Sequence, residues 1–170
     1  LEQRQHIEGE LIANVKESIS QAMTELRDIA KSLSSERLQS HTLTESISQE
    51  IRRINRSGFI RITADVDGTE KKLADHQKLI AFRMVQEGFQ NIIKHAKASE
   101  VKVSIRYQEE WLHISIFDNG TGFNPEEELK KRGGLGLQNI LRRAELIGGK
   151  ASISSRPGEG TTLEIQIAYA

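Results

Sequence analysis

A carboxylate directly followed by a glycine-containing turn is the feature of this chain best suited to ligand chemistry. Asp118 ends an apolar run, and Gly120 and Gly122 then allow the backbone to turn sharply and approach a ligand closely. A partly buried carboxylate at a strand end is costly unless it accepts hydrogen bonds, which a ligand amine, such as that of adenine, could donate. Taken alone, however, the stretch is more typical of a turn in which the aspartate binds its own backbone.

A second group of polar residues lies upstream, on a helix that the apolar spacing predicts over about residues 75–96. Glu87 and Asn91 are four residues apart, so both side chains can reach the same ligand. Asn91 could supply an oxygen to a hard cation such as Mg²⁺, Glu87 could hold one of its waters, and Lys94 would add positive charge near a phosphate. A solvent-exposed helix face would also explain these residues, although asparagine is a poor helix former at a central position. The opposite side is expected to be apolar, formed by Phe82, Val85, Phe89, Ile92, Ile93 and Ala96.

A glycine-rich stretch, Gly133-Gly134-Leu135-Gly136-Leu137, leads into another predicted helix. The free N–H groups at a helix start can bind an anion, and the glycines permit close approach of the backbone. A Walker A loop is excluded because no Gly-Lys-Ser/Thr sequence follows, and a Rossmann site because no parallel βαβ unit surrounds the stretch. By itself the stretch could be a hinge, but its position after the two preceding groups predicts an ATP site.

The elements that position these residues can be predicted from the periodicity of the apolar side chains. Residues 1 to about 56 lack proline and predict a long helix, with a break near Ser34, and then a shorter helix. The apolar stripe of the long helix consists of Ile7, Leu11, Val15, Ile19, Ala22, Leu26, Ile29 and Leu33, and that of the shorter helix of Leu43, Ile47, Ile51 and Ile54. A narrow apolar stripe requires a cover, so we expect a dimer partner or an adjacent helix, with packing on the downstream domain as the alternative.

The part of the chain after Gly58 is expected to mix strands with helices. Strands are predicted at residues 59–66, 101–105, 112–116, 151–155 and 161–168, and helices at residues 75–96 and 135–147. In the first strand, the side chains expected to share one side are Ile60, Ile62, Ala64 and Val66. Residues 124–132 are polar and charged, and are expected to form a mobile loop. Because hairpins join part of the strands, the pattern predicts an α+β fold, a two-layer sandwich in which helices cover one face of a mixed sheet.

The composition restricts the classes of function. The chain has 170 residues, 24 of them basic and 24 acidic, and the resulting net charge of zero argues against general attraction to nucleic acid or anionic membrane. Because there is no cysteine, disulfides, thiolate metal sites and a cysteine nucleophile are excluded. No apolar run approaches the roughly 20 residues that cross a bilayer, so a cytoplasmic location is expected. The chain begins at Leu1, and we expect it to be a piece of a longer protein whose missing segments could include a membrane anchor.

Taken in order, the motifs resemble those of the ATP-binding domain of sensor histidine kinases. That domain is of the Bergerat or GHKL type, a group that includes DNA gyrase, Hsp90 and MutL. Residues 87–96 resemble its N box, residues 118–123 its G1 box, residues 133–137 its G2 box, and residues 158–162 its Gly-x-Gly-Thr stretch. The resemblance covers about residues 58–168, and four motifs in sequence make it specific. It implies ATP and Mg²⁺ as ligands and transfer of the γ-phosphoryl group to a histidine.

The resemblance also implies roles for individual residues. Asn91 would bind Mg²⁺, Glu87 would act in catalysis by positioning water or polarising the reacting group, and Asp118 would read the adenine amine, with Thr161 supporting the adenine end. The residues implied to shape the nucleotide pocket are Gly120, Gly122, Gly134, Leu135, Gly136 and Leu137, and those implied to contact phosphates are Lys94, His95 and Lys97. Residues 124–132 would form a lid that the nucleotide orders.

A narrower resemblance concerns the subgroup of kinases that pair with response regulators carrying a helix-turn-helix output. It rests on the run Lys94-His95-Ala96-Lys97-Ala98 and on the short spacing between the G1 and G2 boxes. It implies that residues 1–40 are a helix from the dimerisation and phosphoacceptor domain, residues 41–57 a linker helix, and residues 58–170 the catalytic domain. It further implies a homodimer through the N-terminal helix and a response regulator as partner, without direct binding to nucleic acid.

One departure from the resemblance concerns the phosphoacceptor. None of the five histidines is followed by Asp or Glu, as the acceptor histidine of this subgroup would be. We therefore expect the chain to bind Mg-ATP without phosphorylating itself, because phosphoryl transfer requires a positioned acceptor. A stand-alone switch protein of the same fold, such as an anti-sigma-factor serine kinase, is an alternative that the long N-terminal helix disfavours. A degenerate scaffold is a further alternative, which the presence of Glu87, Asn91 and Asp118 disfavours.

Overall fold

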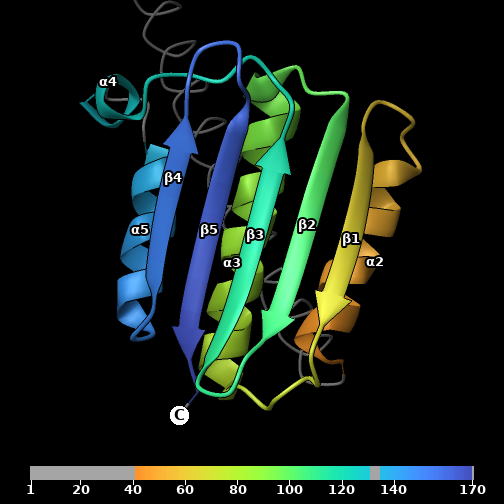
Figure 1. Cartoon of the computed structure of the whole chain (residues 1–170), viewed down its shortest axis with the longest axis vertical. Coiled ribbons are helices and arrows are strands. Elements are labelled where there is room, and N and C mark those ends of the chain that lie inside the picture. The colour runs from red at the N-terminus through yellow and green to blue at the C-terminus, as the bar shows by residue number, and fades with distance from the viewer. Residues whose placement is uncertain (1–40, 131–134, 170) are drawn as a thin grey trace, which may run out of the picture. The chain divides into compact units, whose positions relative to one another are not determined.

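The computed structural model describes residues 41–130 and 135–169 (Figure 1). The long helix predicted for residues 1–40 and its dimer contact therefore lie outside the described residues. The described elements, in chain order, are α2 (Leu43–Asn55), β1 (Arg61–Asp67), α3 (Asp75–Asn91), the π-helix η1 (Ile92–Ala96), β2 (Glu100–Tyr107), β3 (Trp111–Asp118), α4 (Pro125–Lys130), α5 (Leu135–Leu146), β4 (Lys150–Ser155) and β5 (Thr161–Ala168).

The strands form one mixed sheet in the order β1-β2-β3-β5-β4. Strands β1 and β2 are parallel, whereas β2–β3, β3–β5 and β4–β5 are antiparallel pairs. Helices α2, α3 and α5 all lie behind the same face of this sheet (Figure 1). The predicted α+β fold, with helices on one face of a mixed sheet, is confirmed.

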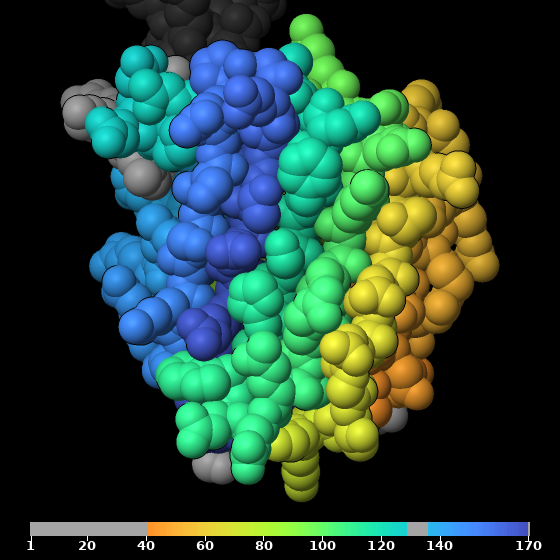
Figure 2. All heavy atoms as spheres, in the orientation of Figure 1, coloured from red at the N-terminus to blue at the C-terminus, as the bar shows by residue number. Residues whose placement is uncertain are grey.

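The core lies between the sheet and the helix layer, and every second residue of the central strands forms its sheet side. Leu112, Ile114 and Ile116 of β3 are at most 1% exposed and point toward the helices. The helix layer contributes Met84 and Phe89 of α3, which are equally buried. Among the described residues, no helix covers the other face of the sheet, and its strands run side by side across the surface in Figure 2. Side chains on the helix side of the sheet therefore determine what any internal site is made of.

Helix α2 packs on β1 and α3 and closes one side of the core. A capping box starts the helix: the Thr42 hydroxyl accepts the Glu45 N–H, and the Glu45 carboxylate accepts the Thr42 N–H. At its other end the Asn55 amide pairs with both backbone groups of Ile62, at 2.8 and 2.9 Å. Asn55 thus provides hydrogen-bond partners for the outward-facing backbone groups of Ile62 on edge strand β1, which would otherwise be open to pairing with another chain.

Two predicted apolar faces differ from the structure. Ile93 was expected with the buried side of its helix, but it is 55% exposed, so that prediction is wrong. The reason is the π-helical turn η1, whose wider turn changes the direction of the side chains that follow Asn91. Of the four residues expected to share one side of the first strand, Ile60, just before β1, and Ile62 are buried, whereas Ala64 and Val66 are exposed because β1 is an edge strand that α2 covers only in part.

The segment expected to be a loop at residues 124–132 contains helix α4. Asn124 starts it, because its side-chain oxygen accepts the Glu126 N–H at 3.1 Å. Pro125 suits the first position of a helix, and Glu126 to Glu128 place negative charge in the first turn. Local capping thus outweighs the polar composition that had suggested a loop throughout.

Candidate functional site

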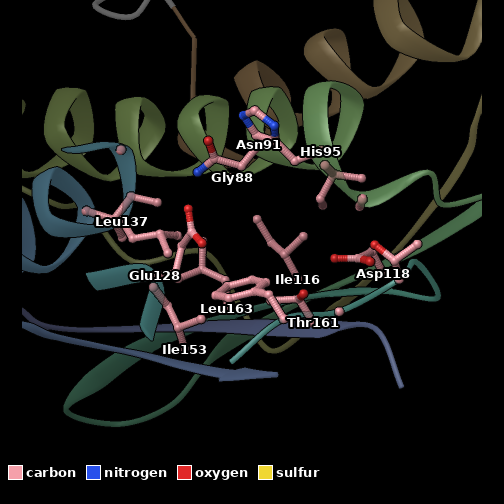
Figure 3. A pocket seen from close by; sticks show the side chains of 17 residues that line it. Gly88, Asn91, His95, Ile116, Asp118, Glu128, Leu137, Ile153, Thr161 and Leu163 are labelled. Atoms are coloured by element: carbon pink, nitrogen blue, oxygen red, sulfur yellow. The ribbon is translucent and has the colours of Figure 1, made fainter. Parts of the chain in front are cut away.

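A cavity of about 490 Å³ lies between the helix layer and the sheet (Figure 3). Asp118 and Thr161 lie together at one end of it, whereas Asn91, Leu137 and Glu128 lie at the other. Its size is within the range typical of small-molecule sites. The lining residues are Gly88, Asn91, Ile92, His95, Ala96, Ile116, Asp118, Thr121, Gly122, Phe123, Glu128, Gly136, Leu137, Ile140, Ile153, Thr161 and Leu163.

Asp118 is the most deeply buried acid that lines the cavity. It ends β3 opposite Thr161 of β5 and is only 2% exposed. One of its oxygens, Oδ1, accepts the Gly120 N–H at 2.8 Å. Burial raises the pKa of the Asp118 carboxyl, while hydrogen bonds from Gly120 and Thr161 act in the opposite direction. The aspartate therefore does bind its own turn, as the simpler interpretation held, but it also faces a cavity where it can accept a ligand N–H.

The turn after Asp118 is packed so closely that two of its positions require glycine. A Cβ on Gly120 would collide with the Ala96 carbonyl, and a Cβ on Gly122, at φ +59°, would collide with the Arg156 carbonyl. The Thr121 N–H donates to the Ala96 carbonyl at 2.8 Å, which ties the turn to the end of η1. These contacts hold Asp118 beneath the helix layer.

The opposite end of the cavity brings Glu87, Asn91 and Gly136 together. A Cβ on Gly136 would lie 2.8 Å from Glu87 Oε1 and 3.3 Å from Asn91 Oδ1, so the glycine allows α5 to start directly against α3. The Asn91 Nδ2 is buried and has no hydrogen-bond partner. A buried amide without a partner is unusual and is a feature of sites that bind a ligand or water. This end therefore offers amide and carboxylate groups beside the first turn of a helix.

The structure brings together most, but not all, of the residues predicted for the site. The predicted residues that line the cavity are Asn91, His95, Asp118, Gly122, Gly136, Leu137 and Thr161. Glu87 and Gly120 do not line it but contact residues that do. Lys94 and Lys97 are exposed and lie outside the lining, with Lys97 in a left-handed conformation that ends the helix. Gly134 and the side chain of Leu135 lie outside the described part of the structure.

Several lining residues were not predicted, and most are apolar. Ile116 precedes Asp118 by two positions and Leu163 follows Thr161 by two, so strand alternation places them on the same side of the sheet. That signal was available in the sequence once Asp118 and Thr161 had been singled out. Phe123 and Glu128 lie within the stretches singled out at residues 118–123 and 124–132, but no alternation marked either residue as part of the lining.

The chain was compared with known proteins. Residues 75–170 match the family model described as "Histidine kinase-, DNA gyrase B-, and HSP90-like ATPase". The signal transduction histidine-protein kinase/phosphatase DegS of Brevibacillus brevis is 31% identical over 92% of this chain and 40% of its own length. The sensor histidine kinase LiaS of Bacillus subtilis is 30% identical over 92% of this chain and 42% of its own.

The fold was also compared with solved structures. The ATP-binding domain of PrrB from Mycobacterium tuberculosis superimposes with a TM-score of 0.60 at 22% identity, covering 75% of this chain and 93% of that domain. The chain spans about two fifths of the length of the two curated relatives above. None of the helices in the described residues is long and apolar enough to cross a membrane.

Proposed function

Because the chain belongs to the histidine kinase-, DNA gyrase B- and HSP90-like ATPase family, we propose that it is the ATP-binding catalytic part of a sensor histidine kinase. In this function the γ-phosphoryl group of ATP passes to a histidine elsewhere in the kinase and then to a response regulator. The observation that carries the proposal is a single cavity with Asp118 at one end and Asn91 beside Gly136 at the other. Both curated relatives are named as histidine kinases, which does not favour a stand-alone switch protein.

The adenine is proposed to bind at the Asp118 end of the cavity. The exocyclic amine donates to the Asp118 carboxylate, which is buried and so discriminates strongly against bases that lack this donor. Ile116 and Leu163 supply an apolar floor beneath the ring, since both line the cavity from the sheet. The Thr161 hydroxyl supports Asp118 from the neighbouring strand.

The phosphates are proposed to lie at the end of the cavity where α5 begins. Free backbone N–H groups at a helix start favour an anion, and the 12-residue helix α5 starts beside Asn91. The residues fit a magnesium ion, because Asn91 Oδ1 and Glu87 Oε1, oxygen atoms of the kind that Mg²⁺ takes as ligands, lie beside Gly136 at this end of the cavity. Bound Mg²⁺ would neutralise phosphate charge, and Glu87 would orient water or the acceptor.

The partners and location are part of the same proposal. Residues 1–40 would form a homodimer in the full-length protein, and the phosphoryl group would pass to a response regulator with a helix-turn-helix output. Lys94, His95 and Lys97 would contact phosphates, and residues 124–132 would act as the lid. The catalytic part would operate in the cytoplasm, with any membrane anchor outside the 170 residues.

Calorimetric titration with ATP, with and without Mg²⁺, tests the proposal. The chain should bind ATP more tightly with Mg²⁺ than without it. Asn91→Ala should lower the ATP affinity measured with Mg²⁺ at least about tenfold, because even residues that contact a metal only through its ligands contribute that much. Gln90→Ala is the matched control, because Gln90 is the exposed neighbour of Asn91 on the same helix. Failure of the unmodified chain to bind ATP would contradict the proposal and favour a scaffold. If both variants respond equally to Mg²⁺, Asn91 does not hold the ion.

A further inference from the structure

The Ser155 hydroxyl joins three segments that shape the Asp118 end of the cavity. It accepts the Phe123 N–H at 2.9 Å, lies 2.9 Å from the Gly160 carbonyl oxygen, and lies 3.0 Å from the Thr161 hydroxyl. Phe123 follows the glycine turn, Gly160 closes the β4–β5 connection, and Thr161 is the cross-strand neighbour of both Ser155 and Asp118. Ser155 does not itself line the cavity, so any effect on a ligand must act through its neighbours.

A count of hydroxyl protons shows that these contacts cannot all be made at once. Ser155 has one proton, which can go either to the Gly160 carbonyl or to Thr161. Thr161 also has one proton, which can go either to Ser155 or to the Asp118 carboxylate. If Ser155 donates to Gly160, then Thr161 must either turn away from Asp118 or face Ser155 without a proton between them. Only donation from Ser155 to Thr161 both leaves the Thr161 proton for Asp118 and keeps a hydrogen bond between the two hydroxyls, and it leaves the Gly160 carbonyl without the Ser155 proton.

We propose that Ser155 is a positioning residue for adenine recognition, which directs the Thr161 hydroxyl onto the Asp118 carboxylate. The resulting chain of hydrogen bonds runs from the Phe123 N–H through Ser155 and Thr161 to Asp118. This inference rests on the proposed function, because the adenine amine is the ligand group that Asp118 accepts. Its consequence is that Asp118 stays an ionised acceptor in a buried place, where an extra donor matters most.

The pH dependence of ATP binding distinguishes this role of Ser155 from a purely structural one, which would leave the titration of Asp118 unchanged. ATP binding should weaken as the pH falls through the Asp118 pKa, because the protonated carboxyl no longer accepts at both oxygens. Without the donor chain the Asp118 pKa rises further, so the weakening should begin at a higher pH. The other ionisable groups on the elements packed around the cavity, common to all variants, include Glu87 on α3, His95 on η1, Glu100 on β2, Glu128 on α4 and Arg156 after β4.

The experiment is a calorimetric ATP titration of the whole chain across mildly acidic to mildly alkaline pH. Ser155→Ala should weaken binding about five- to tenfold at neutral pH and move the pH profile upward. Ser154→Ala is the matched control, because Ser154 is exposed on the opposite side of β4. In an Asp118→Asn background, Ser155→Ala should cause little further loss and no pH shift, since coupled residues are not additive.

The possible outcomes separate this inference from the proposed function. Failure of the unmodified chain to bind ATP contradicts the function itself. A Ser155→Ala variant that binds more weakly with an unmoved pH profile overturns the inference and leaves the function standing. Ser155→Thr retains the hydroxyl and should keep the original pH profile, so the inference can be tested even if the alanine variant does not fold. A threonine variant that titrates differently from the unmodified chain also overturns it.

Discussion

Asp118 combines a favourable position for binding with an unfavourable one for stability. Its carboxylate is 2% exposed and has one oxygen occupied by the Gly120 N–H. Because burial raises its pKa, the ionised form is less stable in the folded protein than in the unfolded chain. The free energy of unfolding is therefore higher at low pH, where the Asp118 carboxyl is neutral, and this stabilisation is lost as the pH rises through the raised pKa. At neutral pH the buried charge therefore costs stability, and the ability to accept a ligand N–H is what it provides.

Replacement of Asp118 by asparagine should separate the two effects. Asp118→Asn keeps an oxygen for the Gly120 N–H but places an amide donor toward the adenine amine, so ATP affinity should fall roughly 10- to 100-fold, as for loss of a hydrogen bond to a charged group. The free energy of unfolding at neutral pH should not decrease, and its difference from the unmodified chain should shrink at acidic pH. Calorimetry and urea denaturation at two pH values measure these changes. Unchanged ATP affinity would remove Asp118 from the adenine site.

Among the elements, α2 shows how a helix that does not line the cavity is held in the core. Its apolar side is almost completely covered, with Leu43 1%, Ile47 0% and Ile54 4% exposed. The periodicity of these residues predicted the helix, but not that β1 and α3 would cover it. Asn55, near the end of α2, lacked any apolar signal, yet its amide pairs with both backbone groups of Ile62.

Removal of the Asn55 amide should therefore affect stability without affecting binding. Asn55→Ala leaves a backbone N–H and a carbonyl of Ile62 without their partner, which should lower the free energy of unfolding by about 1–3 kcal/mol. ATP affinity should be unchanged, because Asn55 does not line the cavity. Arg52→Ala, on the exposed side of the same helix, is the control in chemical denaturation. Equal stability of the two variants would show that water replaces the Asn55 amide without cost.

At the scale of the whole molecule, the chain corresponds to only part of the curated relatives. It spans about two fifths of the length of the curated relatives compared here, and its family match begins at residue 75. The described cavity can hold a nucleotide, whereas the acceptor of a phosphoryl group must be brought in line with it. None of the five histidines has the acidic neighbour that the resembled acceptor would have.

Incubation of the chain with γ-labelled ATP should therefore leave no acid-labile label on the protein. The reason is that phosphoryl transfer depends almost entirely on the position of the acceptor relative to the γ-phosphate. ATP binding under the same conditions, measured in parallel, shows that the site is occupied. Label on a histidine, located by mass spectrometry and absent from Asp118→Asn, would demonstrate that the chain contains its own acceptor.

The sequence by itself determined most of the described elements, though not helix α4, and the spacing of their apolar residues, because periods of 3.6 and 2 residues are local properties of helices and strands. It also determined the order of the motifs around Asn91, Asp118 and Gly136, since each depends on neighbouring residues alone. Only the tertiary structure decided which of the apolar sides are covered: Val66 is exposed on an edge strand, and Ile93 is turned outward by η1.

The tertiary structure also decided which polar residues meet. Gly136 lies against Glu87 and Asn91, which precede it by 49 and 45 residues in the sequence, and Ser155 lies beside Thr161 and Phe123. No local pattern encodes these contacts, because they result from the way α5 and the β4–β5 hairpin pack on the remainder of the sheet and helix layer. Lys94 and Lys97 are close to Asn91 in the sequence, yet both are exposed and lie outside the lining of the cavity, so their predicted contact with phosphates stays a prediction.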